Sequence, residues 1–384
     1  MIRFILADLK RLWAASLVII LLVALASALG VGITLQERAL RLGSARAADK
    51  FDLVIGAAGS ETQLVLSSVF LQPAPLPLLA GDVLPKLKAD PRVAFAAPIG
   101  FGDSFQAYPV VGSTPELITA LNNGAALEGR APAGEHDAVI GSAVGLTLGQ
   151  SFEPMHGAAG DAGHVHTEFS YQVTGRLLPT GTAWDRAIIV PIEAVWEIHG
   201  LHAEEEPPGV PAILVKPKTI ADAYRLRGEY RGDQTVAVFP GEVLTRLYAT
   251  LGDARQVMSI IAIAAQTLVA AAIALIAIAH VAQRRRQIGA LRAFGAPRSA
   301  VFGIVWSELL TLMGSGIALG FLLGWAAVRL ICDQLTRQNG VVLPVEFQAS
   351  DLGLAFALLV AAAVIAAIPA LLAYRQPAAA ALRA

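Results

Sequence analysis

The sequence contains few charged residues and almost no cysteine. Only 15% of its 384 residues are Asp, Glu, Lys or Arg, whereas 55% are hydrophobic, which is too apolar for an ordinary soluble protein. Cys332 is the only cysteine, so no disulfide can form within one chain. A domain outside the cytoplasm must therefore be held together by its hydrophobic core.

The sequence also lacks the common motifs of nucleotide and active sites. A P-loop requires Gly-Lys followed by Ser or Thr to cradle phosphates, and no Gly-Lys pair occurs anywhere in the chain. HExxH, CxxC and nucleophile-elbow motifs are absent as well. The chain is therefore predicted not to be an enzyme by itself, and any ATP that it uses must bind to another protein.

What the sequence does contain is four long apolar stretches. A membrane-spanning helix needs about 20 predominantly apolar residues, and each stretch meets that length. The four predicted spans have their apolar runs at Trp13–Leu35, Val257–Gln283, Leu309–Val328 and Leu352–Tyr374. The first run is longer than the core of a cleaved signal peptide, so an uncleaved anchor is favoured over cleavage near Ala24, Ala26 or Ala28.

Basic residues set the predicted orientation, because they accumulate on the cytoplasmic side. They precede the first span, fill the loop after the second and follow the fourth, and Asp8 is the only acid in these three segments. Both termini and that loop are therefore expected in the cytoplasm. The predicted segments are the N-terminus with span one (1–35), an outer domain with helical stalks (36–256), span two (257–282), a cytoplasmic loop (283–300), span three (301–331), a short outer loop (332–350), span four (351–374) and a cytoplasmic tail (375–384).

The predicted fold class is an α-helical membrane protein with four transmembrane helices and a mixed α+β domain inserted between helices one and two. Short apolar or β-branched runs bounded by Gly and Pro indicate strands in that domain, at Phe51–Ala57, Ala138–Ser142, Ala187–Val190, Val210–Lys216 and Thr235–Phe239. Helical spacing occurs at Asp82–Ala89, Thr114–Leu121 and Thr219–Tyr230. The segment Ala57–Leu79 is expected to be extended, as a buried lining or an exposed docking strip. A helix is expected to continue from the first span to about Lys50.

The cytoplasmic loop QRRRQIGALRAFGAPRSA (283–300) combines charge with an apolar stripe. Ile288, Leu291 and Phe294 recur every three residues, so they fall along one side of a helix. Arg284–Arg286 alone would fit an anchor for anionic lipids, but lipid binding does not explain the stripe. The loop is therefore predicted to be gripped by another protein. The candidate contact residues are Arg284, Arg285, Arg286, Gln287, Ile288, Gly289, Leu291, Arg292, Phe294 and Gly295.

Glycines at four-residue spacing mark predicted helix contacts. Gly316, Gly320 and Gly324 lie in the third span, where small residues let helices approach closely. Packing against the fourth span within one chain is favoured over a contact between two chains. Gly30 and Gly32, near the outer end of the first span, are further candidates for helix packing.

Histidines form a candidate metal site in the outer domain. His164 and His166 alternate, so on a strand both would face one ion, and His156 precedes them in a Gly-rich loop. Imidazole is a common zinc ligand and also suits copper and nickel. His199 and His202 form a second small cluster. The alternative is a solvated loop that happens to contain histidine.

Four stretches of the sequence resemble one known family. QRRRQIGALRAFGAPRSAVFGIVWSELL is similar to the coupling-helix signature of the FtsX-like permeases of ABC transporters, which include the MacB and lipoprotein-releasing Lol proteins. IPALLAYRQPAAAALRA resembles the closing segment of that family. HDAVIGSAVGLTLGQSF and YQVTGRLLPTGTAWDRAIIVPIEAVW resemble the MacB-type periplasmic core. One departure is Gln287, where the family often has Glu before Ile-Gly.

The resemblance implies a function and partners. Two permease copies, as a homodimer, would pair with two copies of a cytoplasmic ATPase that holds ATP and Mg²⁺. The helix of Gln287–Ala296 would sit in a groove of that ATPase, and ATP-driven closure would push the outer domain, which is mechanotransmission. The substrate would be a lipoprotein, peptide, lipid or metal-linked ligand at a bacterial inner membrane. A periplasmic substrate or adaptor protein would be a further partner. A signalling subunit that activates a periplasmic partner without transport is the alternative, and the resemblance gives no role to nucleic acid.

Overall fold

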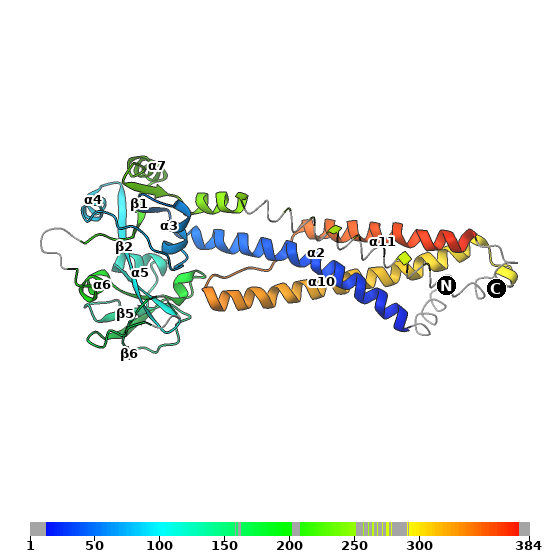
Figure 1. Ribbon diagram of the computed structural model, residues 1–384, viewed down its shortest axis with the longest axis horizontal. Helices are drawn as coiled ribbons and strands as arrows, with labels where there is room; N and C mark the ends of the chain where they lie inside the picture. The colour runs from blue at the N-terminus through cyan, green and yellow to red at the C-terminus, as the bar shows by residue number, and fades with distance from the viewer. Residues whose placement is uncertain are drawn as a thin grey trace. The chain divides into compact units, whose positions relative to one another are not determined.

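The computed structural model describes residues 13–157, 159, 163–201, 208–250, 290 and 292–375, together with isolated positions between 256 and 278. Its residues divide into two compact units. We call Met1–Ala39, Gly252–Cys332 and Val345–Ala384 the helical unit, and Leu40–Leu251 with Asp333–Pro344 the sheet unit. Figure 1 labels the elements of both.

The helical unit contains the apolar helices. Within the described residues, three helices are long and apolar enough to cross a membrane: α2 (Trp13–Ala48), α10 (Arg298–Asn339) and α11 (Ala349–Arg375). The predicted continuation of the first span to about Lys50 is confirmed, because α2 runs to Ala48. The second predicted span falls mostly outside the described residues.

Helix α10 is longer than the sequence pattern indicates. Its 42 residues pass through the expected end of the third span and occupy part of the expected outer loop. The polar segment after Cys332 is compatible with an exposed helix, so loss of hydrophobicity does not end it. Gly340 ends it, with a φ of +75° and an N–H that donates to Thr336 O at 2.8 Å, because this left-handed conformation suits glycine.

Gly316, Gly320 and Gly324 of α10 face α2, which corrects the expectation that they pack against the fourth span. A Cβ on any of them would overlap backbone atoms of α2. A Cβ on Gly316 would lie 2.9 Å from the carbonyl oxygen of Ile20. The corresponding distances are 2.6 Å from Gly320 to the oxygen of Ala24 and 2.9 Å from Gly324 to the oxygen of Ala28. A Cβ on Gly32 would touch Val328 of α10 at 3.8 Å. Gly30 accepts a hydrogen bond from Thr34 Oγ1 within α2.

Enlarging Gly320 is expected to destabilise the helical unit. A leucine would have to displace the Ala24 carbonyl, and overpacking costs about 1–3 kcal/mol. The same substitution at Gly303, where a Cβ meets nothing within 4 Å, is the matched control. Thermal unfolding of the full chain in detergent should show a lower midpoint for Gly320→Leu than for Gly303→Leu. Equal midpoints would contradict the close approach of α10 to α2.

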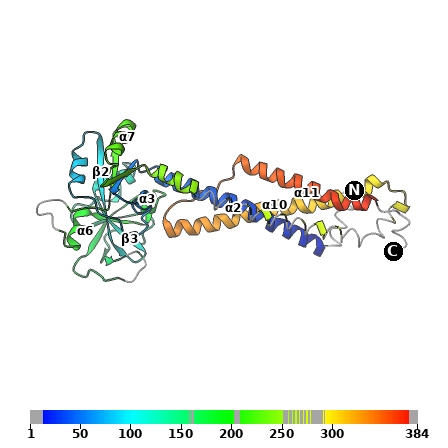
Figure 2. The ribbon, with the colours of Figure 1, turned by 45° about the horizontal axis from the view of Figure 1, so that its top comes forward.

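The sheet unit is built on one mixed sheet (Figure 2). Its described strands follow the order β11-β1-β10-β2-β3-β9-β5-β8-β4, with β6 beside β8 and β7 beside β2. The strands are β1 (Leu53–Ala57), β2 (Val93–Phe105), β3 (Tyr108–Ser113), β4 (Glu128–Gly129), β5 (Asp137–Ile140), β6 (Ser151–Phe152), β7 (Met155–His156), β8 (Tyr171–Arg176), β9 (Ile188–Pro191), β10 (Ala212–Pro217) and β11 (Thr235–Val238). All but β5–β8 and β3–β9 pair antiparallel.

Helices cover both faces of this sheet. The alternation of side chains along each strand sends Leu53 and Ile55 to one face and Val54 to the other. The Val54 face packs on two helices, and the opposite face packs on three. They are α3 (Glu61–Ser68) and α5 (Pro115–Leu121) on the first face, and α4 (Val83–Ala89), α6 (Ile192–Ile198) and α7 (Ile220–Glu229) on the second; the short 3₁₀ helix η1 (Ala183–Arg186) precedes β9.

Helix α3 replaces part of the extended segment expected at Ala57–Leu79. Ser60 caps it, because the Ser60 hydroxyl accepts a hydrogen bond from Gln63 N at 3.3 Å. Leu64 and Val65 are then buried in the core beneath the sheet. The run Leu64–Leu71 therefore packs against the hydrophobic core. This agrees with the alternative of a buried lining rather than with that of an exposed strip.

Candidate functional site

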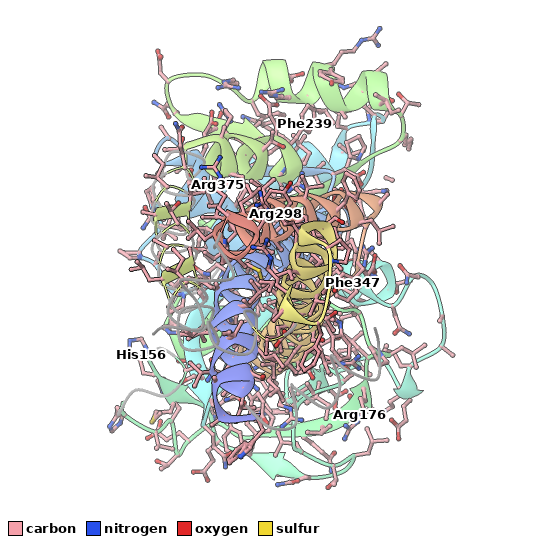
Figure 3. The ribbon with its side chains drawn as sticks, turned by 90° about the vertical axis from the view of Figure 1, so that its right-hand side faces the viewer. His156, Arg176, Phe239, Arg298, Phe347 and Arg375 are labelled. Atoms are coloured by element: carbon pink, nitrogen blue, oxygen red, sulfur yellow. The ribbon has the colours of Figure 1, made fainter. Side chains whose placement is uncertain are left out.

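Three imidazole rings surround one buried carboxylate in the sheet unit. Asp103 lies on β2, and its side chain is 2% exposed. Its Oδ1 lies 3.5 Å from His156 Nδ1, 3.3 Å from His166 Nε2 and 3.8 Å from His199 Nε2. We call these four residues the Asp103 cluster. His156 is labelled in Figure 3.

Strand pairing brings the first two members together. β7 pairs antiparallel with β2 in a register that places His156 opposite Asp103. Directly before Asp103, the pairing of β2 with β3 shifts between Gly100 and Asp103. Such irregularities bend a strand and re-aim its side chains, and they are frequent beside functional sites. The bulge therefore provides a local reason why an acidic side chain turns inward from an apolar strand.

The end of helix α6 positions His199. His199 is the C-cap of α6, and Gly200 follows it with a φ of +67°. Gly200 N donates to Glu197 O at 3.0 Å, and Leu201 N donates to Trp196 O at 2.8 Å, which is the Schellman arrangement. The end of α6 is thus fixed where the His199 ring meets β2.

Gly102 leaves room for that ring. A Cβ on Gly102 would lie 2.8 Å from His199 Nε2, closer than two unbonded atoms can approach. The backbone at Gly102 has a φ of +153°, a conformation that side chains disfavour. A glycine next to Asp103 is therefore required for His199 to reach the carboxylate.

The carboxylate of Asp103 has no hydrogen bond to any described residue. Both of its oxygens are buried without a partner, and so are His166 Nε2 and His199 Nε2. A buried ionised carboxylate is costly unless it is paired or bound to a metal. The Asp103 carboxylate also affects the buried Tyr171 nearby. The pKa of the Tyr171 phenol is raised mainly by burial and secondly by the negative charge of Asp103.

The structure brings together two of the three histidines predicted to share a metal. His156 and His166 both face Asp103, whereas His164 is exposed, with its ring centroid 6.3 Å from that of His166. His164 contributes its backbone instead, since His156 N donates to His164 O at 2.8 Å. His199 takes the place next to the carboxylate, and His202 lies outside the described residues.

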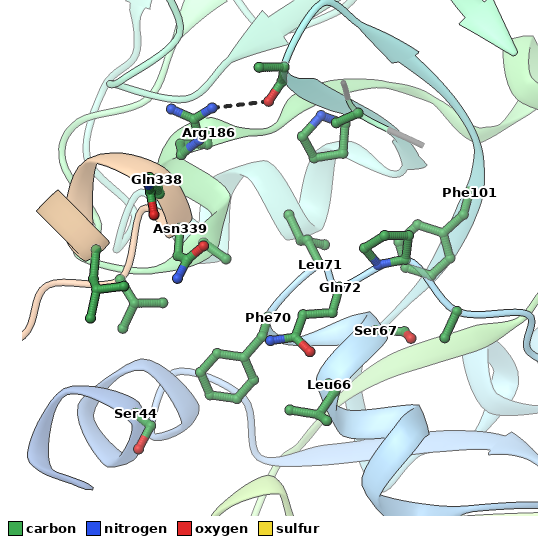
Figure 4. Close-up of a pocket in the computed structure, with 18 of the residues that line it drawn as sticks. Ser44, Leu66, Ser67, Phe70, Leu71, Gln72, Phe101, Arg186, Gln338 and Asn339 are labelled. Atoms are coloured by element: carbon green, nitrogen blue, oxygen red, sulfur yellow. Dashed lines mark hydrogen bonds between the residues drawn. The ribbon is translucent and has the colours of Figure 1, made fainter. Parts of the chain in front are cut away.

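The Asp103 cluster lies at the wall of a large cavity in the same unit. The cavity has a volume of about 1090 Å³, and Gly102, Asp103 and His156 contribute to its lining. Leu66, Phe70 and Leu71 line it as well (Figure 4). Arg186 spans part of the wall by donating to Ala107 O at 3.0 Å. The cavity is thus mainly apolar, with the carboxylate and one imidazole at its boundary.

The predicted partner-binding loop is described only at its C-terminal end. Arg284, Arg285, Arg286, Gln287, Ile288, Gly289 and Leu291 lie outside the described residues. Phe294 is 92% exposed, which is unusual for a phenyl ring in a folded chain. Phe294 N donates to Ala290 O at 3.0 Å and Gly295 N donates to Arg292 O at 3.1 Å, so a helical turn ends here. Gly295, with a φ of +91°, allows that ending.

Comparison with known proteins bears on the part of the chain that includes this turn. Residues 259–378 match the family model described as FtsX-like permease C-terminal. This part of the chain is FtsX-like. The FtsX-like segment contains Phe294, Gly295 and the helices α10 and α11, so the resemblance seen in the sequence around Gln283–Leu310 is confirmed at the level of the family.

Two solved structures are similar to part of this chain. The periplasmic region of MacB from Actinobacillus actinomycetemcomitans is 10% identical, with a TM-score of 0.34, over 52% of this chain and 95% of that one. The extracellular domain of the noncanonic ABC-type transporter YknZ from Gram-positive bacteria is 14% identical, with a TM-score of 0.29, over 48% and 98%. No curated protein matches the sequence.

Proposed function

We propose that this chain is the permease subunit of an ATP-driven ABC transporter that works by mechanotransmission. In this proposal, a cytoplasmic ATPase binds the loop 283–300 and moves it, and the connected helices carry that movement to the sheet unit. The sheet unit then acts on a substrate on the periplasmic side of a bacterial inner membrane. The match of residues 259–378 to the FtsX-like family is the observation that carries the proposal.

Two further features support an external ATPase. The sequence contains no Gly-Lys pair and therefore no P-loop of its own. The exposed Phe294 lies between a helical turn and the start of α10. An exposed aromatic side chain flanked by arginines has the composition of a binding hot spot, where aromatic residues and Arg are enriched. Both features fit a chain that receives its energy through a protein contact.

The continuity of the helices supports a mechanical role. Helix α2 has 36 residues and α10 has 42, whereas about 20 residues cross the apolar part of a bilayer. Each is long enough to extend beyond the membrane without a break. Their contact through glycines, backbone to backbone, favours movement as a pair. In the proposed assembly, two permease copies and two ATPase copies act together.

The proposal is tested by purifying the full chain, with an affinity tag, from its own bacterium in mild detergent. We expect an ATPase that carries a P-loop to co-purify in a one-to-one ratio and to hydrolyse ATP faster in the complex than alone. The sheet unit should be accessible to protease only from the periplasmic side. A chain that purifies without any ATPase, or a sheet unit exposed to the cytoplasm, would refute it.

A further inference from the structure

We propose that the Asp103 cluster is a zinc site whose ligands are Asp103, His156, His166 and His199. The inference is independent of the proposed transport function, because it concerns the sheet unit alone. It replaces the ligand set expected from the sequence by exchanging the exposed His164 for His199 and by adding a carboxylate. Three observations carry it: the spacing of the ligand atoms, the tautomer of His199 and the unsatisfied carboxylate.

The spacing matches the shell of a tetrahedral metal. The nitrogens lie 3.3–3.8 Å from Asp103 Oδ1, which is too long for good hydrogen bonds, normally about 2.7–3.2 Å. Zinc bonds of about 2.0–2.2 Å at tetrahedral angles place neighbouring ligand atoms about 3.3 Å apart. The ligand atoms of Asp103, His156 and His199 all lie within 4.8 Å of one another. His166 lies outside that group of three but 3.3 Å from Asp103 Oδ1, so a rotation of its ring would bring it in as the fourth ligand.

The hydrogen bonding of His199 points its lone pair into the cluster. His199 Nδ1 lies 2.8 Å from Val195 O, and a carbonyl can only accept, so Nδ1 carries the proton. In the neutral ring, Nε2 then presents a lone pair toward Asp103. A ring nitrogen that donates to a carbonyl while its other nitrogen faces a metal is the usual outer-shell arrangement of metal-binding histidine.

The unsatisfied carboxylate supplies the reason for a cation. Asp103 is buried with neither oxygen hydrogen-bonded to the described residues. A zinc ion would bond directly to this oxygen and to the lone pairs that face it. Nitrogen and oxygen donors in a four-ligand set suit zinc better than magnesium or calcium, which prefer oxygen. His156 is more than half exposed, so the ion has a route of entry.

The site would join segments that are distant in the sequence. Asp103 lies on β2, His156 lies on β7 and His199 ends α6. His166 directly follows Val165, which forms an isolated bridge with Met155. Gly102, Asp103 and His156 also line the cavity. Zinc would therefore fix one wall of the cavity, and its loss would free that wall.

The test is calorimetric titration of ZnCl₂ into the full chain in detergent, purified without a histidine tag and dialysed against a chelator. We expect one zinc per chain. Asp103→Asn and His199→Ala should each weaken binding about 100-fold or more, because even the loss of outer-shell partners costs about 10- to 100-fold. Cobalt bound at the same site should give the intense visible absorption of a tetrahedral complex.

Two controls separate this site from other histidines. His164→Ala should bind zinc as the parent does, and so should His136→Ala, whose exposed ring stacks on Phe169. Gly102→Ala keeps every ligand but pushes on the His199 ring, so it should weaken binding as well. No zinc binding by the parent chain at micromolar concentration would overturn the proposal. So would undiminished binding in Asp103→Asn, or an equal loss in His164→Ala and His199→Ala.

For a variant that binds less zinc, thermal unfolding distinguishes loss of the site from loss of the fold. Zinc should raise the unfolding midpoint of the parent chain, because a ligand that binds only the folded state stabilises it. It should leave the midpoint of Asp103→Asn unchanged, while the zinc-free midpoints of the two chains agree. A zinc-dependent rise in Asp103→Asn equal to that of the parent would also overturn the site.

Discussion

Replacing Phe294 by aspartate should uncouple the chain from the proposed ATPase. The side chain is 92% exposed, so the substitution removes no buried contact among the described residues and should leave the fold intact. In the complex, a hot-spot aromatic contributes about 2 kcal/mol or more, which is about 30-fold in affinity. Co-purification of the ATPase should drop accordingly, and stimulation of ATP hydrolysis should be lost.

Ile220→Asp is the matched control for this experiment. Ile220 is 79% exposed at the start of α7 in the sheet unit. Its replacement also exchanges an exposed apolar side chain for an acid, on a surface that the proposed ATPase does not contact. We expect this variant to bind the ATPase as the parent does. Normal coupling in Phe294→Asp would remove the loop 283–300 from the proposed mechanism.

Removing one partner of the ion pair between Arg38 and Asp351 should strongly destabilise the helical unit. The two side chains are each 7% exposed and form two hydrogen bonds, of 2.7 and 2.8 Å. The pair ties α2 to the first turn of α11, where Asp351 Oδ2 also accepts from Gln348 N. An unpaired buried charge costs about 3–5 kcal/mol, so Asp351→Ala should lower the midpoint of thermal unfolding in detergent by many degrees.

Two controls identify the lost pairing as the cause. Asp82→Ala removes an ion pair with Lys86 whose side chains are 48% and 67% exposed, and such a pair contributes about 0–1 kcal/mol. The double variant Arg38→Met with Asp351→Leu leaves no charge unpaired and should recover most of the stability. A double variant as unstable as Asp351→Ala would show that packing, not the orphaned charge, dominates.

Much of the sheet unit was predictable from local patterns. The strands β1, β5, β9, β10 and β11 fall within about two residues of the predicted runs. They are short, apolar and bounded by Gly or Pro, so the pattern alone identifies them. The helices α4, α5 and α7 were predictable for the same reason, since their apolar residues recur at helical spacing.

The long strand β2 escaped prediction. It contains Pro98 and two glycines, which ordinarily indicate a break rather than a 13-residue strand. Tertiary pairing with β10 on one side and β3 on the other overrides that local preference. Asp103 was missed with it, because an acid in an unassigned segment gives no sign of being buried.

The metal-binding hypothesis illustrates the same limit. Alternation along the chain predicted that His164 and His166 face one ion, with His156 added from the preceding loop, but it could not show which residues lie across from them. The position of Asp103 depends on the register of β7 against β2, and that of His199 on where α6 ends. Ligands drawn from separate segments become visible only when the fold is known.

The order of strands has a consequence for how the sheet unit matures. β1, at the beginning of the unit, pairs on one side with β10 and on the other with β11, so that Val54 lies opposite Leu214 and Val238. Pairings between such distant residues form slowly, because the long intervening loop must close first. The first strand therefore cannot complete its pairing until nearly the whole unit has been synthesised, so β1 has unpaired edges for most of that time.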